Sequence, residues 1–291
     1  MTPELEDRVC LTATLADSYQ AAAELSAKWG SPVDASTIRQ HACAAGQRAA
    51  TQTHRREREP AAATPGGGIA TKPAALVIMM DGWLARQRGE DWGDRSTDTS
   101  LGRGAWHEIK GAVIYRLEQA GQTAGGWGVI AQKYVVAWQG EPLEFGRRVQ
   151  AEARRRGLAE AQEVFVVADG SVWIWNVQAD RFGRAQGVLD FYHASQHLWA
   201  VAHALFPSDL AAARVWVERL LHQLRHGQEA GVLQTLADLP KWCAQQQRAV
   251  PPEVTREREY FGNHREHVHY EAMVAVSYTH LRAHETDSYL V

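Results

Sequence analysis

The chain has 291 residues, of which 45% are hydrophobic and 22% are charged, and its formal net charge at pH 7 is -3. This composition is that of a globular protein with one sizeable core and a smaller appended unit. It excludes a protein that is basic throughout, so any contact with nucleic acid must depend on local charge. The longest apolar runs are far short of the roughly 18 to 20 residues of a membrane helix, and the acidic start MTPELEDRVC differs from a signal peptide, so we expect a cytoplasmic protein without a membrane partner.

The N-terminal segment predicts two helices joined by a tight turn. Apolar residues recur at helical spacing over residues 15–29, and after Gly30 the sequence SPVD leads into a second helix over residues 35–45. The polar residues on one side of this second helix are Ser36, Arg39, Gln40 and Gln47. Because polar side chains on such a face can enter the DNA major groove, residues 1–51 are interpreted as a helix-turn-helix DNA-binding region. An ordinary helical hairpin is the alternative.

Residues 52–74 contain HRREREPAAATPGGG, which is charged, then Pro-rich, then Gly-rich, and predicts a flexible linker. A strand over residues 75–80 should follow and end on Asp81-Gly82, with a polar loop to about residue 105. Strands are then expected over residues 107–117 and 132–138, with a Gly-rich turn between them. A helix over residues 142–156 precedes a strand over residues 164–168 that ends on Asp169-Gly170.

A short helix over residues 172–179 and a strand over residues 186–189, ending on Asp190, complete the predicted alternation of strands and helices. From residue 192 the sequence becomes helical, and residues 207–250 are predicted to be a helical insertion. Its apolar seam consists of Leu210, Ala213, Val217, Leu220 and Leu224. Residues 253–270 predict a polar helix.

Asp81 and Asp169 are expected to lie together. Each follows an apolar strand, and the order of strands and helices is one that brings the ends of these two strands together. Three strands, a helix and a further strand carrying a second acid are typical of the ribonuclease H-like fold, in which the ends of the first and fourth strands meet. Two adjacent carboxylates need a counter-charge, and oxygen ligands favour Mg²⁺ or Mn²⁺. Two such ions can stabilise both oxygens of an in-line phosphodiester displacement. For either Asp-Gly pair alone, an ordinary turn is the alternative.

Four segments resemble the DDE transposases of bacterial insertion sequences. They are Asp81-Gly82, GEPLEFGRRVQAEARRRGL at residues 140–158, VVADGSVWIWN at residues 166–176 and VLDFYHASQHLW at residues 188–199. The DGSxWIWN and DFYHxxxHLW blocks are the most specific. The resemblance implies an α/β protein with a ribonuclease H-like mixed sheet and a helical insertion over residues 75–275, preceded by a small all-α helix-turn-helix domain. The implied activity is Mg²⁺-dependent cutting of transposon ends and their joining to target DNA, by a homo-oligomer.

The same resemblance assigns roles to individual residues. Asp81 and Asp169 become the first two catalytic metal ligands, and Asp190 with His193 matches a DxxH signature that shapes the site and contacts DNA. His193 and His197, at i and i+4, could also ligate a metal. Because no HExxH pattern or third ligand accompanies them, packing or phosphate contact is favoured.

The third acid of the family is expected in a Gly-Ser-Gly-x-Val-Glu segment soon after YFGNHREHVHY, and the sequence has no such segment. From Val276 it reads VSYTHLRAHETDSYLV, which resembles a translated sequencing-library adapter. Residues 276–291 are therefore interpreted as an artefact, and the fragment is expected to be inactive although its parent is active. The alternative acids, outside the expected context, are Glu257, Glu259, Glu266 and Glu271.

Two other functions fit the sequence. One is a DNA-binding regulator with a degenerate nuclease core, in which Ser36, Arg39 and Gln40 matter and the aspartates 81 and 169 do not. The other is a ribonuclease H-like nuclease unconnected with transposition.

Overall fold

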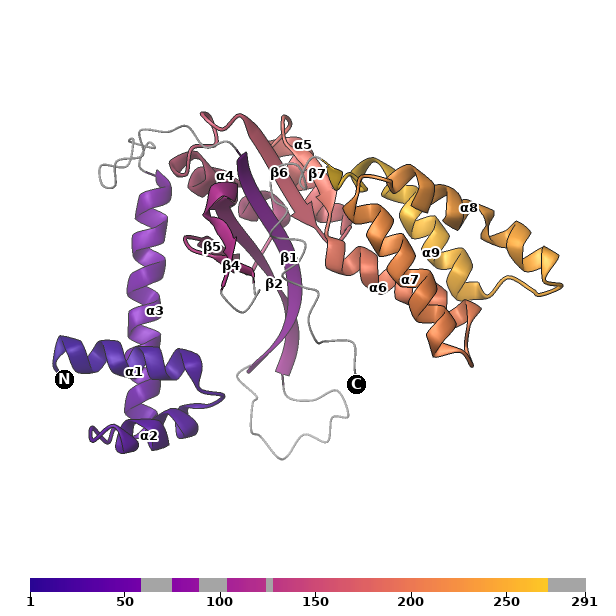
Figure 1. The fold of residues 1–291 in the computed structure, drawn as a ribbon. Coiled ribbons are helices and arrows are strands. Elements are labelled where there is room, and N and C mark those ends of the chain that lie inside the picture. The colour runs from indigo at the N-terminus through magenta and orange to yellow at the C-terminus, as the bar shows by residue number, and fades with distance from the viewer. Residues whose placement is uncertain (59–74, 89–103, 124–127, 272–291) are drawn as a thin grey trace. The chain divides into compact units, whose positions relative to one another are not determined.

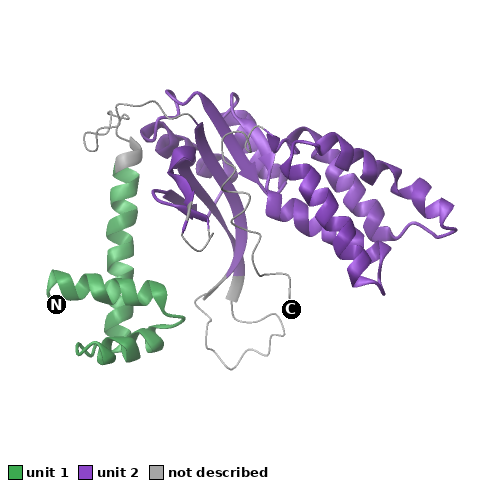
Figure 2. Cartoon of the chain, viewed as in Figure 1, with its two compact units in different colours: residues 1–62 green, residues 63–291 purple. Residues whose placement is uncertain are grey.

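The structure is a computed structural model that describes residues 1–58, 75–88, 104–123 and 128–271. The chain divides into two compact units, Met1–Ala62 and Ala63–Val291 (Figure 2). Most of the predicted linker, from residue 59 to residue 74, and the adapter-like segment 276–291 lie outside the described residues.

The described residues of the first unit form three helices, α1 (Pro3–Leu15), α2 (Tyr19–Lys28) and α3 (Ala35–Arg58). Their small core contains Val9, Ala22 and Ile38, one from each helix. Glu6 of α1 also accepts hydrogen bonds from His41 Nδ1 at 3.3 Å and Arg48 NH2 at 2.8 Å, both on α3. These polar contacts fix α1 against α3 where few apolar side chains are present to do so.

The prediction of two helices in this unit was wrong in three respects. A helix precedes them, and Leu15 and Trp29 are exposed instead of forming a buried stripe. The second helix also continues through residues 52–58, which were assigned to the linker. Arg, Glu, Gln and Ala are good helix formers, and no proline follows α3's start until Pro60, so the helix has no reason to end sooner.

The second unit is built on a five-stranded mixed sheet in the order β5-β2-β1-β6-β7. Its strands are β1 (Ala75–Arg88), β2 (Gly104–Arg116), β5 (Tyr134–Trp138), β6 (Glu163–Ala168) and β7 (Gln186–Leu189). Strand β2 is antiparallel to β1 and β5, whereas β6 is parallel to β1 and β7. The predicted chain order of these strands and their intervening helices is confirmed, and the unit is a mixed α/β structure.

Helices cover both faces of this sheet (Figure 1). Leu76, Ile78 and Met80 of β1 pack toward α4 (Pro142–Arg155) and α5 (Val172–Arg181). Ala75 and Val77 pack on the other face, toward a bundle of helices. The bundle consists of α6 (Phe191–Leu205), α7 (Leu210–Arg225), α8 (Glu229–Gln245), α9 (Pro252–Asn263) and the short 3-10 helix η2 (Arg265–His267). Burial on both faces explains why residues 75–80 of β1 and nearly all of β6 are apolar.

Three predicted boundaries in this unit differ from the structure. Strand β1 does not end at Asp81 but runs to Arg88. Its antiparallel pairing with β2 continues beyond Met80, where its pairing with β6 ends. A small hairpin was missed, formed by β3 (Ala120–Gln122) and β4 (Gly128–Ile130) after the 3-10 turn η1 (Leu117–Gln119). The predicted helix over residues 253–270 breaks after Asn263.

The predicted helical insertion corresponds to α7 and α8. Four residues of its predicted seam are buried, namely Ala213, Val217, Leu220 and Leu224, whereas Leu210 is 71% exposed at the start of α7. Within the part of the chain that the structure describes, no helix combines the length and hydropathy required to cross a membrane.

Candidate metal and nucleic-acid sites

Strand register brings Asp81 and Asp169 to neighbouring positions. Met80 and Ala168 are the last paired residues of the parallel strands β1 and β6, and each aspartate is the next residue along its chain. Since neighbouring strands lie about 4.8 Å apart, the backbones of the two acids lie side by side. Alternation along each strand directs both toward the face covered by α6 and α9. The register therefore places the backbones of Asp81 and Asp169 next to each other.

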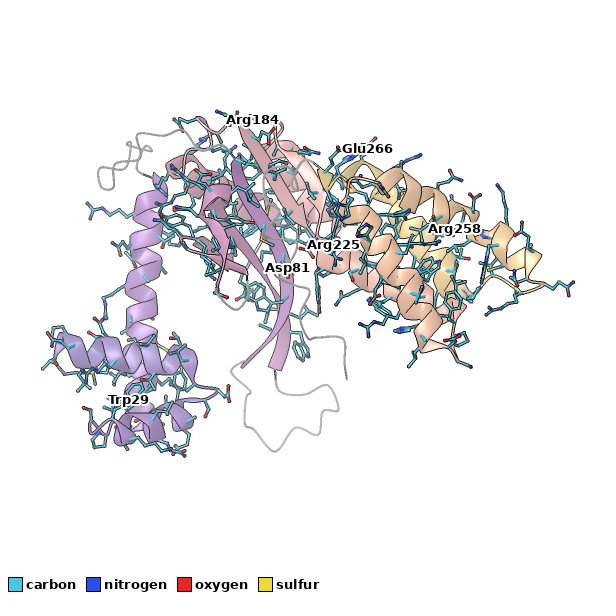
Figure 3. The ribbon with its side chains drawn as sticks, viewed as in Figure 1. Trp29, Asp81, Arg184, Arg225, Arg258 and Glu266 are labelled. Atoms are coloured by element: carbon cyan, nitrogen blue, oxygen red, sulfur yellow. The ribbon has the colours of Figure 1, made fainter. Side chains whose placement is uncertain are left out.

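Asp81 is exposed and lies inside β1, where that strand passes the end of β6 (Figure 3). Its Oδ1 accepts a hydrogen bond from the Gly82 backbone N–H at 2.7 Å. Gly111 lies opposite Asp81 on β2, and a Cβ there would sit 2.6 Å from the ring of Trp83. The absence of a side chain at Gly111 thus leaves room for the Trp83 indole.

Asp169 is half-buried in a tight turn that follows β6. Its Oδ1 accepts from the Ser171 N–H at 2.8 Å and its Oδ2 from the Ser171 hydroxyl at 2.9 Å. Its backbone carbonyl accepts a hydrogen bond from the Tyr260 hydroxyl at 2.7 Å. Gly170 has a φ of 100°, and a Cβ there would lie 2.9 Å from His264 Nε2 and 3.0 Å from the Tyr260 oxygen. The turn is therefore fixed in conformation and closely packed against α9.

Asp190 caps α6 and holds His193 beside the acid pair. Its Oδ1 accepts from the backbone N–H of His193 at 3.0 Å and contacts the Nδ1 of the same residue at 3.3 Å. Its own N–H donates to the Ala168 carbonyl at 2.7 Å, which ties the end of β7 to the end of β6. The structure thus places Asp190 and His193 next to the ends of the strands that carry the aspartates.

The electrostatics of this cluster are consistent with its geometry. The hydrogen bond to Asp190 raises the pKa of His193 above its usual value, and the charges of Asp169 and Asp81 add to the effect. Burial alone would raise the pKa of Asp190, but hydrogen bonds from His193 outweigh it and the pKa is lowered. A protonated His193 next to carboxylates provides a positive charge suited to contact a phosphate.

Of the alternative acids, Glu257 on α9 is the most buried, at 3% exposed. His197 Nδ1 lies 2.5 Å from its Oε2, and Arg256 Nε donates to its Oε1 at 2.9 Å. Both carboxylate oxygens are thus engaged away from the pair of aspartates. The remaining alternatives, Glu259, Glu266 and Glu271, are exposed.

His197 takes part in packing in this structure. Its ring stacks on the Tyr260 ring at a centroid distance of 3.7 Å, and its Nδ1 faces Glu257. These contacts fit packing, which together with phosphate contact was favoured over metal ligation. Burial raises the pKa of the Tyr260 phenol, and the nearby carboxylates, Asp169 first among them, raise it further. The phenol therefore remains a hydrogen-bond donor at neutral pH.

Asp81 and Asp169 provide the hard oxygen donors that suit Mg²⁺ or Mn²⁺, ions that keep several waters as ligands. Among the described residues, no three or more His, Cys, Asp or Glu side chains are grouped closely enough to hold a metal ion. An ion at this position would therefore depend on these two carboxylates and on water, because no third protein acid from this part of the chain joins them.

A second candidate site lies on the first unit. The predicted DNA-contacting residues Ser36, Arg39, Gln40 and Gln47 are all exposed and line one open groove of about 880 Å³ along α3. Tyr19 of α2 and Cys43 belong to the same groove and were not singled out from the sequence. Ser36 has a structural task as well, since its hydroxyl donates to Asp34 at 2.5 Å at the start of the helix.

Sequence reasoning missed Tyr260 of α9 and His264, the residue after its end, which lie against Asp169 and Gly170. Their spacing of four residues places them on one face, although the partner of that face could not be read from the spacing. In comparisons with protein-family models and with curated proteins, the chain matches none of them.

Proposed function

We propose that this chain is the DNA-binding and catalytic region of a DDE transposase from a bacterial insertion sequence. The observation that carries the proposal is the register between β1 and β6, which presents Asp81 and Asp169 at adjacent positions. These strands are the first and fourth in chain order of the five-stranded sheet, as a ribonuclease H-like arrangement requires. The resemblance of the DGSxWIWN and DFYHxxxHLW blocks gives the same assignment independently.

Asp81 and Asp169 are the residues that would hold Mg²⁺ or Mn²⁺. When bound, such ions activate the attacking oxygen and stabilise the leaving oxygen of a phosphodiester. Ser171 orients the Asp169 carboxylate through two hydrogen bonds, so that the remaining lone pairs can face the ion. His193, held by Asp190, supplies a positive charge for a DNA phosphate beside the acids.

The first unit has a separate role in the proposal. Arg39, Gln40 and Gln47 would read the transposon ends from the exposed groove along α3, while the second unit carries the chemistry. Action as a homo-oligomer on DNA and a cytoplasmic location belong to the same proposal.

A third carboxylate available to the ion is absent from the described residues. We therefore expect this chain to bind divalent metal and DNA without cleaving strands. Robust Mg²⁺-dependent cleavage by the chain itself would overturn this expectation. The same observation favours a second candidate function, a DNA-binding regulator whose nuclease core is degenerate.

Metal titration separates the two functions. Binding of Mn²⁺ to the chain is measured by the loss of the free-ion signal in electron paramagnetic resonance. The transposase proposal predicts one saturable site that Asp81→Asn and Asp169→Asn each abolish, while Glu259→Gln, at an exposed carboxylate of α9, leaves it unchanged. Equal binding by all four proteins would favour the regulator.

A further inference from the structure

We propose that Tyr260 is a positioning residue for the metal site, through which α9 holds the turn that presents Asp169. The inference rests on the proposed function, because it concerns the same ion. It assigns a role to α9 that does not depend on any carboxylate of that helix reaching the metal.

The turn is held from two sides. On the side-chain side, Ser171 donates to both oxygens of Asp169. On the backbone side, the Tyr260 hydroxyl donates to the Asp169 carbonyl at 2.7 Å, across 91 residues of sequence. Gly170 lies against Tyr260 and His264 so closely that a Cβ would approach both within 3.0 Å. Removal of the phenol oxygen would leave a carbonyl without its partner and a gap beside the turn.

The Tyr260 ring is itself held by His197, which contacts a buried carboxylate. His197 stacks on the ring at 3.7 Å with an interplanar angle of 22°. The His197 imidazole is anchored by the 2.5 Å contact with Glu257. A buried carboxylate is costly unless it is paired and hydrogen-bonded, and here His197 contacts one oxygen of Glu257 while Arg256 binds the other. The chain of contacts runs from Glu257 through His197 and Tyr260 to Asp169.

The position of α9 in the sequence gives this network its significance. The helix follows the insertion α7–α8, and in the fold it packs against α6, whose first turn carries His193. One helix thus supports the turn of Asp169 after the chain has passed through the insertion. The aromatic residue of α9, and not its buried acid, is what connects that helix to the site.

The test is to measure Mn²⁺ binding to the Tyr260→Phe variant of this chain by electron paramagnetic resonance. The substitution keeps the ring and its stacking and removes only the hydroxyl. We expect the Mn²⁺ dissociation constant to increase about fivefold, the effect of losing one hydrogen bond. The matched control is Tyr134→Phe on β5, which removes a tyrosine hydroxyl bonded to Gln132 in the same unit and should leave the dissociation constant unchanged.

The outcomes distinguish this inference from the proposed function. If Asp169→Asn abolishes binding and Tyr260→Phe matches the unsubstituted chain, the positioning role is wrong while the metal site stands. If Asp169→Asn also has no effect, the metal site itself fails. Should Tyr260→Phe not fold, the Mn²⁺ affinity of Glu257→Gln tests the inference instead. This substitution keeps the shape of the buried acid and weakens its contact with His197. A weaker Mn²⁺ affinity then supports the network, and an unchanged affinity overturns it.

Discussion

Gly170→Ala gives the sharpest prediction for stability. Gly170 has a φ of 100°, a conformation that costs a residue with a Cβ about 1–3 kcal/mol. The new methyl group would also meet His264 Nε2 at 2.9 Å and the Tyr260 oxygen at 3.0 Å. Because both side chains are packed by neighbouring rings, they can yield only partly, and we expect a total loss of about 2–4 kcal/mol in the free energy of unfolding.

Urea denaturation followed by far-ultraviolet circular dichroism measures this loss. Gly262→Ala is the matched control, since Gly262 lies in α9 and a methyl group on its Cα would have nothing within 4 Å. That substitution should be neutral or stabilise by up to about 1 kcal/mol, because alanine favours helix. If Gly170→Ala unfolds within about 0.5 kcal/mol of the control, on the order of the scatter for surface substitutions, the close packing of the turn against α9 is incorrect.

Two further predictions concern charge. Asp190→Asn should lower the pKa of His193, which is raised by the hydrogen bond to Asp190, while an asparagine still caps α6. A histidine whose pKa is raised by folding stabilises the fold fully below its ordinary pKa of 6.5, and this contribution is lost as pH rises through the folded-state pKa. The stability of the variant should therefore depend less on pH in this window. NMR titration of the imidazole measures the pKa and urea melts measure the stability; an unchanged pKa would refute the pairing of His193 with Asp190. Arg39→Ala should weaken binding of duplex DNA about tenfold, whereas Arg8→Ala, at an exposed arginine of α1, should leave the affinity unchanged. Fluorescence anisotropy measures both affinities. If the two variants bind DNA equally well, α3 is not part of the proposed DNA interface.

Much of the central sheet could be predicted because its signals are local. The run of residues 164–168 is apolar at every position, since β6 is covered on both faces, and the Asp-Gly pair after it marks the turn. The same reasoning located β7 between residues 186 and 189. The order of the elements then indicated a ribonuclease H-like sheet, in which the first and fourth strands are neighbours, and β6 is indeed parallel to β1.

The remainder depended on contacts between distant segments. Strand β1 passes Asp81 because β2 pairs with it, and Asp-Gly alone favours a turn at that point. The bond between Tyr260 and Asp169 joins residues 91 apart, which helical spacing on α9 cannot reveal. Glu257 looked like any other acid of a charged helix until its burial beside His197 was known.

The most direct test of the shared cation is anomalous diffraction from crystals of this chain soaked in Mn²⁺. We predict one strong anomalous peak about 2 Å from a carboxylate oxygen of Asp81 and from one of Asp169. Crystals of Asp81→Asn should lack the peak. Side chains that remain without a common peak at saturating Mn²⁺, or a peak bound by other residues alone, would contradict the assignment of these two aspartates as ligands of one ion.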